Sequence, residues 1–119
     1  MEEQALMVAR ALAAGRVLVG ASLCVAPNLA AQWAGEDART PGARVIIRAL
    51  GARDAALGLG TLAVLHDPPQ LRRWLVASSA CDAADFAATV AGPPSRARGL
   101  VLGLAATATV VGLGAALVI

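Results

Sequence analysis

Two aspartates three positions apart stand in the middle of an otherwise apolar stretch, SSACDAADFAATV, residues 78–90. Residues three or four apart share one face of a helix, so Asp82 and Asp85 point the same way, and Ser78 and Thr89 extend the polar stripe. An aspartate at the centre of a membrane helix costs about 2.5–3.5 kcal/mol. Such residues need a compensating partner, and within a bilayer they mark a functional site.

The preceding apolar stretch supplies a partner at the same depth. It contains Arg53 and Asp54, and a hairpin about the turn sequence HDPPQL sets Arg53 opposite residue 84. A guanidinium group offers five donors in a rigid fork, which suits two carboxylates at once. We therefore expect Arg53 to lie between Asp82 and Asp85.

Two further arginines complete the expected charge balance. Arg48 lies in the same stretch as Arg53, and Arg16 lies in the first apolar stretch of the chain. Three guanidinium groups then match three carboxylates, and the centre of the protein is neutral. Because Arg16 and Arg48 lie nearer the ends of their helices, the alternative is that they extend to the membrane surface.

This constellation suits three kinds of function. We predict that it binds the head group of a lipophilic small molecule, with Asp82, Asp85 and Arg53 at the centre and with Arg16, Arg48, Asp54, Ser78 and Thr89 around them. The first alternative is a cofactor-independent enzyme for epoxide opening, cyclisation or isomerisation, in which one aspartate is the acid, the other the base, and Arg53 orients both. The second is a proton or ion pathway through a homo-oligomer. A network that only fixes the register of the helices is the purely structural interpretation.

Four apolar blocks position these side chains. Of the 119 residues 58% are hydrophobic and 15% charged, with a mean hydropathy of +0.68, whereas soluble domains are about 45–50% apolar. A soluble bundle is disfavoured because residues 99–119 carry no charge and would form a helix without a polar face. Each block is about one membrane thickness long. We predict a single all-α domain, an integral membrane up-down-up-down four-helix bundle with helices at about 6–33, 44–65, 71–91 and 97–119.

Composition also limits the partners and the location. Ten arginines are spread along the chain, so nucleic-acid binding is excluded. No phosphate-binding loop, dinucleotide-binding glycine pattern or metal-ligand cluster occurs, so we expect no cofactor and no metal. The start MEEQ is acidic, unlike a signal peptide. The chain is expected to be a multi-pass protein of the cell inner membrane, with a membrane lipid or another lipophilic molecule as its partner.

Orientation and assembly have weaker signals. Trp33 at the end of the first block is typical of an anchor at the membrane surface. The glycines of a GxxxG motif, Gly99 and Gly103, would allow two copies to pair through the last helix. The arginines outside the spans slightly favour cytoplasmic loops after the first and third blocks. Those assigned to this side are Arg39, Arg44, Arg96 and Arg98.

The stretches RALGARDAALGLG (48–60) and LRRWLVASSACDAADFAA (71–88) also resemble a group of small bacterial four-helix membrane proteins classed as a domain of unknown function. The recurring features of that group are an arginine and an Arg-Asp pair between glycines in the second helix and an aspartate pair in the third. The resemblance covers residues 44–90, implies the same membrane fold and brings no activity with it. The corresponding positions in this chain are Arg48, Gly51, Arg53, Asp54, Gly58, Asp82 and Asp85.

Overall fold

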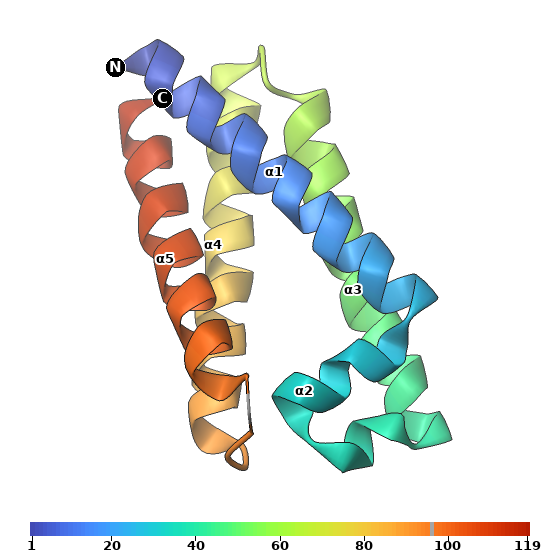
Figure 1. Cartoon of the computed structure of the whole chain (residues 1–119). Coiled ribbons are helices and arrows are strands. Elements are labelled where there is room, and N and C mark those ends of the chain that lie inside the picture. The colour runs from blue at the N-terminus through green and yellow to red at the C-terminus, as the bar shows by residue number, and fades with distance from the viewer. Residues whose placement is uncertain (96) are drawn as a thin grey trace.

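The computed structural model describes residues 1–95 and 97–119, and this part of the chain is helical and without strands. The predicted all-α class is confirmed for these residues. Four long helices run alternately between the two ends of a molecule 43 Å long, with both termini and the α3–α4 turn at the same end (Figure 1). Arg96, one of the arginines used for the orientation, lies outside the described residues. The long helices are α1 (Glu2–Val25), α3 (Pro41–Ala63), α4 (Pro68–Ala91) and α5 (Arg98–Val118).

The first helix is shorter than predicted, and the range 6–33 is wrong. Pro27 has no N–H and its ring excludes the helical conformation from the residue before it, so Ala26 leaves the helix with φ −128° and ψ 70°. The chain then crosses the end of the bundle in three short elements. They are η1 (Pro27–Ala30), α2 (Ala31–Ala34) and η2 (Glu36–Arg39). Trp33 therefore lies in a short crossing segment and not at the end of a long helix.

The other three long helices lie close to the predicted ranges, and two of them begin at side-chain caps. The Thr40 hydroxyl accepts a hydrogen bond from the Ala43 N–H at the start of α3, and the Asp67 carboxylate accepts one from the Gln70 N–H at the start of α4. A proline follows each cap at the first helical position, where no N–H is needed. These caps fix where the α3–α4 hairpin turns.

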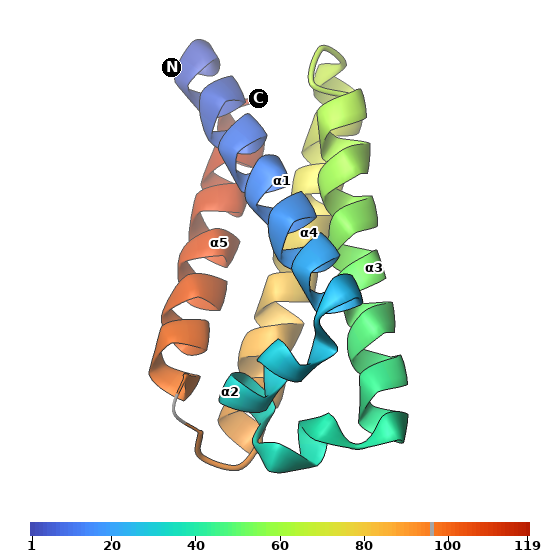
Figure 2. The same cartoon turned by 45° about the vertical axis from the view of Figure 1, so that its right-hand side comes forward.

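The long helices pack as two close pairs, α1 with α3 and α4 with α5. Glycines allow the first pair to approach backbone to backbone, since a Cβ added to Gly51 would lie 2.6 Å from the carbonyl oxygen of Gly20. In the second pair, Gly112 leaves room for the Ser79 hydroxyl. By contrast, α3 and α4 touch each other little although they are neighbours in the chain. Figure 2 shows α1 crossing the molecule from the α5 side to the α3 side.

Two small apolar clusters lie towards the two ends of the molecule. One joins all four long helices near the termini, and the other lies under the crossing segment. Buried polar side chains lie on α3 and α4 between them, and they include Thr61, Ser78, Asp82 and Thr89. The members of the first cluster are Ala5, Ala9, Leu65, Leu71, Leu75, Ala115 and Ala116, and those of the second are Ala30, Ala31, Ala38 and Ile47.

Among the described residues two helices, α1 and α5, are long and apolar enough to cross a membrane. The other two long helices carry more charged residues, among them Arg53 and Asp54 on α3 and Asp82 and Asp85 on α4, which lower their hydropathy.

Candidate functional site

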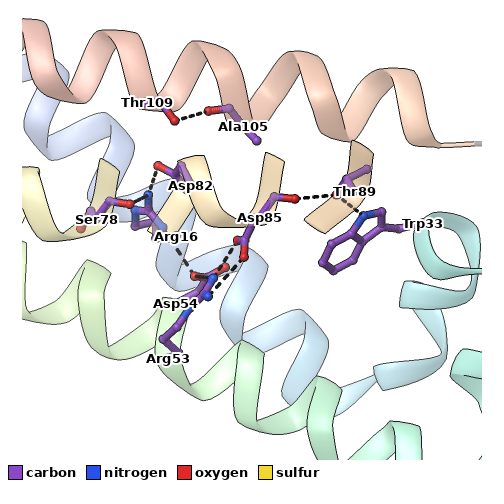
Figure 3. A network of polar contacts seen from close by, with 10 residues as sticks. All are labelled: Arg16, Trp33, Arg53, Asp54, Ser78, Asp82, Asp85, Thr89, Ala105 and Thr109. Atoms are coloured by element: carbon purple, nitrogen blue, oxygen red, sulfur yellow. Dashed lines mark hydrogen bonds and ion pairs between the residues drawn. The ribbon is translucent and has the colours of Figure 1, made fainter. Parts of the chain in front are cut away.

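Arg53 on α3 reaches across to α4 and holds Asp85 at two points. Its Nη1 donates to Asp85 Oδ1 at 3.2 Å and its Nη2 to Asp85 Oδ2 at 2.7 Å (Figure 3). The same Nη2 donates to Asp54 Oδ1 at 3.0 Å. Such a two-point pair is the strong form of an arginine–carboxylate contact. Arg53 therefore meets α4 next to residue 84, the position expected from counting residues along the hairpin.

Asp82 is held by Arg16 of α1, so the expected bridge from Arg53 to both Asp82 and Asp85 is not formed. Arg16 Nη2 donates to Asp82 Oδ2 and, at 3.1 Å, to the backbone oxygen of Ser78. Counting residues from the α3–α4 turn could not predict that Arg16 pairs with Asp82, because Arg16 lies on α1, outside this hairpin. As a result the two aspartates of α4 are paired with arginines from two different helices.

Asp54 connects the two halves of the network. Its Oδ1 accepts from Arg53 Nη2 at 3.0 Å and from Arg16 Nη1 at 3.5 Å. The order Asp82, Arg16, Asp54, Arg53, Asp85 is therefore a continuous chain of ion pairs through α1, α3 and α4 (Figure 3).

Arg48 does not belong to this network. It lies five positions before Arg53, about 140° around the helix axis, and its Nε donates to the backbone oxygen of Cys24 at 3.2 Å on an exposed surface. The predicted balance of three guanidinium groups against three carboxylates is therefore wrong. The described network holds two arginines and three aspartates.

The polar stripe on α4 extends beyond the aspartates as expected, but its ends contact different groups. Thr89 Oγ1 donates to the backbone oxygen of Asp85 at 2.7 Å and accepts from Trp33 Nε1 at 2.9 Å. Ser78 contributes its backbone oxygen, while its Oγ is buried without a hydrogen-bond partner among the described residues. Trp33 was not expected at the site, because the sequence places it at the end of a spanning helix.

Two spaces adjoin the network. A small cavity of about 10 Å³ lies beside Asp82, and its wall includes Arg16, Thr61, Ser78 and Ser79. It is too small for a lipid or a drug-sized molecule. A more open hollow of about 170 Å³ lies at the Trp33 end, one helical turn beyond Asp85. It is lined by Trp33, Ala34, Ala88, Thr89, Gly92 and Pro93.

Burial is uneven along the network. The side chains of Arg16, Asp54 and Asp82 are 12–14% exposed, whereas Arg53 is 32% and Asp85 24% exposed. The outer pair spans the α3–α4 side, where the two helices pack little. The polar centre is therefore closed around Asp82 and partly open at Asp85.

This geometry limits the chemistry of the site. An acid and a base that share Arg53 would need Asp82 and Asp85 on the same guanidinium, and each has its own arginine instead. What the arrangement offers is one enclosed carboxylate beside a small cavity and one accessible Arg–Asp pair beside an open hollow. The glycines suggested for pairing two copies, Gly99 and Gly103, are exposed, and no described atom lies within 4 Å of a Cβ placed on either.

No family model matches the chain, and no curated protein and no solved structure matches it significantly.

Proposed function

We propose that the protein is a multi-pass membrane protein in which α1, α3, α4 and α5 form a four-helix bundle across the bilayer. The shortest of these helices, α5, has 21 residues, which rise about 31 Å and match the ~30 Å of a hydrocarbon core. The charges of α3 and α4 that would oppose insertion are largely paired inside the bundle.

Large apolar side chains on the outer surface of every long helix support this proposal. In lipid such residues are at no disadvantage, while in water they would form extended apolar patches. They include Met7, Leu18 and Val19 on α1, Val45, Ile46 and Leu59 on α3, Val76, Phe86 and Val90 on α4, and Leu100, Leu104, Val110 and Leu117 on α5. The resemblance to small bacterial proteins makes the cell inner membrane the proposed location.

The membrane proposal is tested by expressing the chain in bacteria and washing the membranes with alkaline carbonate, which strips proteins that are not embedded. The protein is expected to stay in the pellet. Its recovery in the wash would contradict integral insertion.

Within this bundle the function that the geometry supports best is binding of a lipophilic small molecule at the open α3–α4 side. The observation that carries it is the partial exposure of the Arg53–Asp85 pair. Lipid tails offer no hydrogen bonds, so a charged pair left partly uncovered at this depth is unfavourable without a further polar partner. A ligand with a polar head and an apolar body supplies that partner and remains compatible with the surrounding lipid.

The hollow beside Trp33 and Thr89 supports the same location. Its volume of about 170 Å³ accommodates one ring-sized group, since an apolar cavity of about 150 Å³ holds benzene. A larger apolar body would extend from the hollow into the surrounding lipid. The indole ring and the small alanine side chains form an apolar wall, and the Arg53–Asp85 pair lies within reach of the ligand's polar head.

The ligand proposal is tested by native mass spectrometry of the protein extracted gently from the membranes in which it was made. We expect a non-protein species to copurify with the wild type and with Asp37→Asn, an exposed residue of η2, but not with Asp85→Asn. A matched pair of variants probes the hollow independently of the charges. Ala88→Leu fills it and should lose the ligand, whereas the neighbouring exposed Ala87→Leu should keep it. Absence of any copurifying species from the wild type, or its retention in Ala88→Leu, would contradict the proposal.

A further inference from the structure

Among residues 1–95 and 97–119 the ion-pair network contains one carboxylate more than it has guanidinium groups. Arg16 and Arg53 serve Asp54, Asp82 and Asp85, while Arg48 points outward to Cys24. An unbalanced charge removed from water is strongly unfavourable, and a carboxylate in that position is usually neutralised by a proton. One of the three aspartates is therefore expected to be neutral.

The hydrogen bonds differ among the three aspartates. Asp85 accepts at both oxygens from the fork of Arg53, and Asp54 accepts from two guanidinium groups, so both have the contacts of ionised carboxylates. Asp82 accepts from Arg16 at Oδ2, and its Oδ1 has no hydrogen-bond partner among the described residues. The free oxygen of an enclosed carboxyl group is where a proton can be placed without disturbing an ion pair.

The small cavity beside Asp82 offers a polar contact for that proton. Its volume of about 10 Å³ is near the ~10–15 Å³ that one water needs. A buried water also needs two to four polar partners. Ser78 is 6% exposed and lines this cavity, and its buried Oγ has no hydrogen-bond partner among the described residues. Asp82 and the nearby hydroxyl-bearing Thr61 and Ser79 complete the polar wall.

We propose that this cavity holds a single water molecule bonded to Ser78 Oγ, and that Asp82 carries a proton on Oδ1 which it donates to this water. The proton comes from solvent, a new O–H bond forms on Oδ1, and no other bond changes. The centre then holds two guanidinium groups, two carboxylates and one neutral carboxyl group. The protein thus has a proton-binding site inside the bundle, separate from the proposed ligand site at Asp85 and independent of whether a ligand binds there.

The charged groups facing Asp82 are consistent with one bound proton. From α1 comes Arg16, from α3 come Asp54 and Arg53, and α4 itself carries Asp85. The part of α5 that lines the cavity consists of Ala108 and Gly112 and brings no charge. One proton therefore makes this set neutral.

The test is solid-state NMR of the ¹³C-aspartate-labelled wild type in lipid vesicles at neutral pH, with each carboxyl signal assigned. We expect the chemical shift of a neutral carboxyl group at Asp82 and those of ionised carboxylates at Asp54 and Asp85. This measurement requires no substitution, so it does not depend on whether a variant folds. Ionised signals at all three positions, or a neutral signal at Asp54 or Asp85 instead, would overturn the proposal.

A conservative variant tests whether the charge excess is the cause. Asp54→Asn leaves two arginines and two aspartates, so Asp82 should lose its proton and show the ionised shift at the same pH, while Asp37→Asn should leave it neutral. A neutral Asp82 that persists in folded Asp54→Asn would contradict the argument from charge. The water is tested separately with Ser78→Val, which fills the cavity. We expect the cross-peak between water protons and the Asp82 carboxyl carbon to disappear, and its persistence would contradict the assigned water.

Discussion

Arg16→Met is the substitution that should affect the protein most strongly through a single side chain. Arg16 is 12% exposed and donates to Asp82, to Asp54 and to the backbone oxygen of Ser78, so it connects α1 to both α3 and α4. Removing one partner of a buried ion pair costs about 3–5 kcal/mol, because the remaining charge stays uncompensated. In a bilayer or micelle the unfolded helices also find polar partners, which reduces the loss. We therefore expect a loss of about 3 kcal/mol, roughly a hundredfold in the unfolding equilibrium constant.

The assay is reversible unfolding in mixed micelles by an increasing fraction of SDS, followed by the fluorescence of the two tryptophans. The matched control is Arg48→Met, which removes the same charge from another long helix, α3. Arg48 is exposed and donates to a single carbonyl oxygen, so the control should lose no more than about 1 kcal/mol. Methionine keeps an unbranched side chain and a similar helix propensity in both variants.

A second change separates the charge from the packing. When Arg16→Met is combined with Asp82→Leu, the excess of carboxylates over guanidinium groups in the network falls from two back to the one of the wild type, and apolar replacements of buried ion pairs are often neutral. The double variant should therefore recover to within about 1 kcal/mol of the wild type. Equal losses in Arg16→Met and Arg48→Met would refute the reasoning, since they would show that the buried network contributes nothing beyond an exposed contact.

Two further predictions follow from the helix packing and from the site. Gly51→Ala should destabilise the protein by about 1–3 kcal/mol in the same SDS titration, because the new methyl group would press on the carbonyl oxygen of Gly20. Gly103→Ala has open space around it and should stabilise by up to about 1 kcal/mol through helix propensity, so a neutral Gly51→Ala would contradict the close approach. Trp33→Phe keeps an aromatic ring but removes the Nε1 donor to Thr89, which should cost about 1 kcal/mol in thermal unfolding. An unchanged melting temperature would show that this hydrogen bond does not hold the crossing segment.

Some of the network was predictable because it depends on the chain's local geometry. The turn and its caps fix the α3–α4 hairpin, so counting from the turn finds the level at which Arg53 meets α4. The sequence also indicates that Arg48 does not belong to the network. Two arginines five residues apart lie about 140° apart around a helix and cannot both face one neighbour. Helical phase therefore places Arg48 outside the centre and leaves three carboxylates with two guanidinium groups.

The break after α1 was also visible in the sequence. Pro27 stands inside an apolar stretch, and the backbone chemistry of proline determines the end of α1 more than the length of that stretch does. The partner of Asp82 is a different case. It depends on where α1 crosses the bundle, and that crossing follows from the fit of Gly20, Gly51 and Gly58 between two backbones. This fit depends on the surfaces of both helices at once, so the pattern of residues along either helix does not predict it.

The contrast between the two kinds of packing explains why the polar centre lies where it does. Within each close pair, small residues let the helices touch along their length, as small residues do in membrane helix pairs. Between the pairs the apolar contact is concentrated near the termini. Further along the bundle Arg16 and Arg53 bond to α4, and beyond them Trp33 of the crossing segment donates to Thr89. In the proposed membrane bundle lipid would provide no hydrophobic force between helices, so these ion pairs would hold the two pairs together at the level of the network. Weakening the outer Arg53–Asp85 pair is therefore expected to widen the α3–α4 side while the cluster near the termini stays packed, and the proposed ligand would enter from that side.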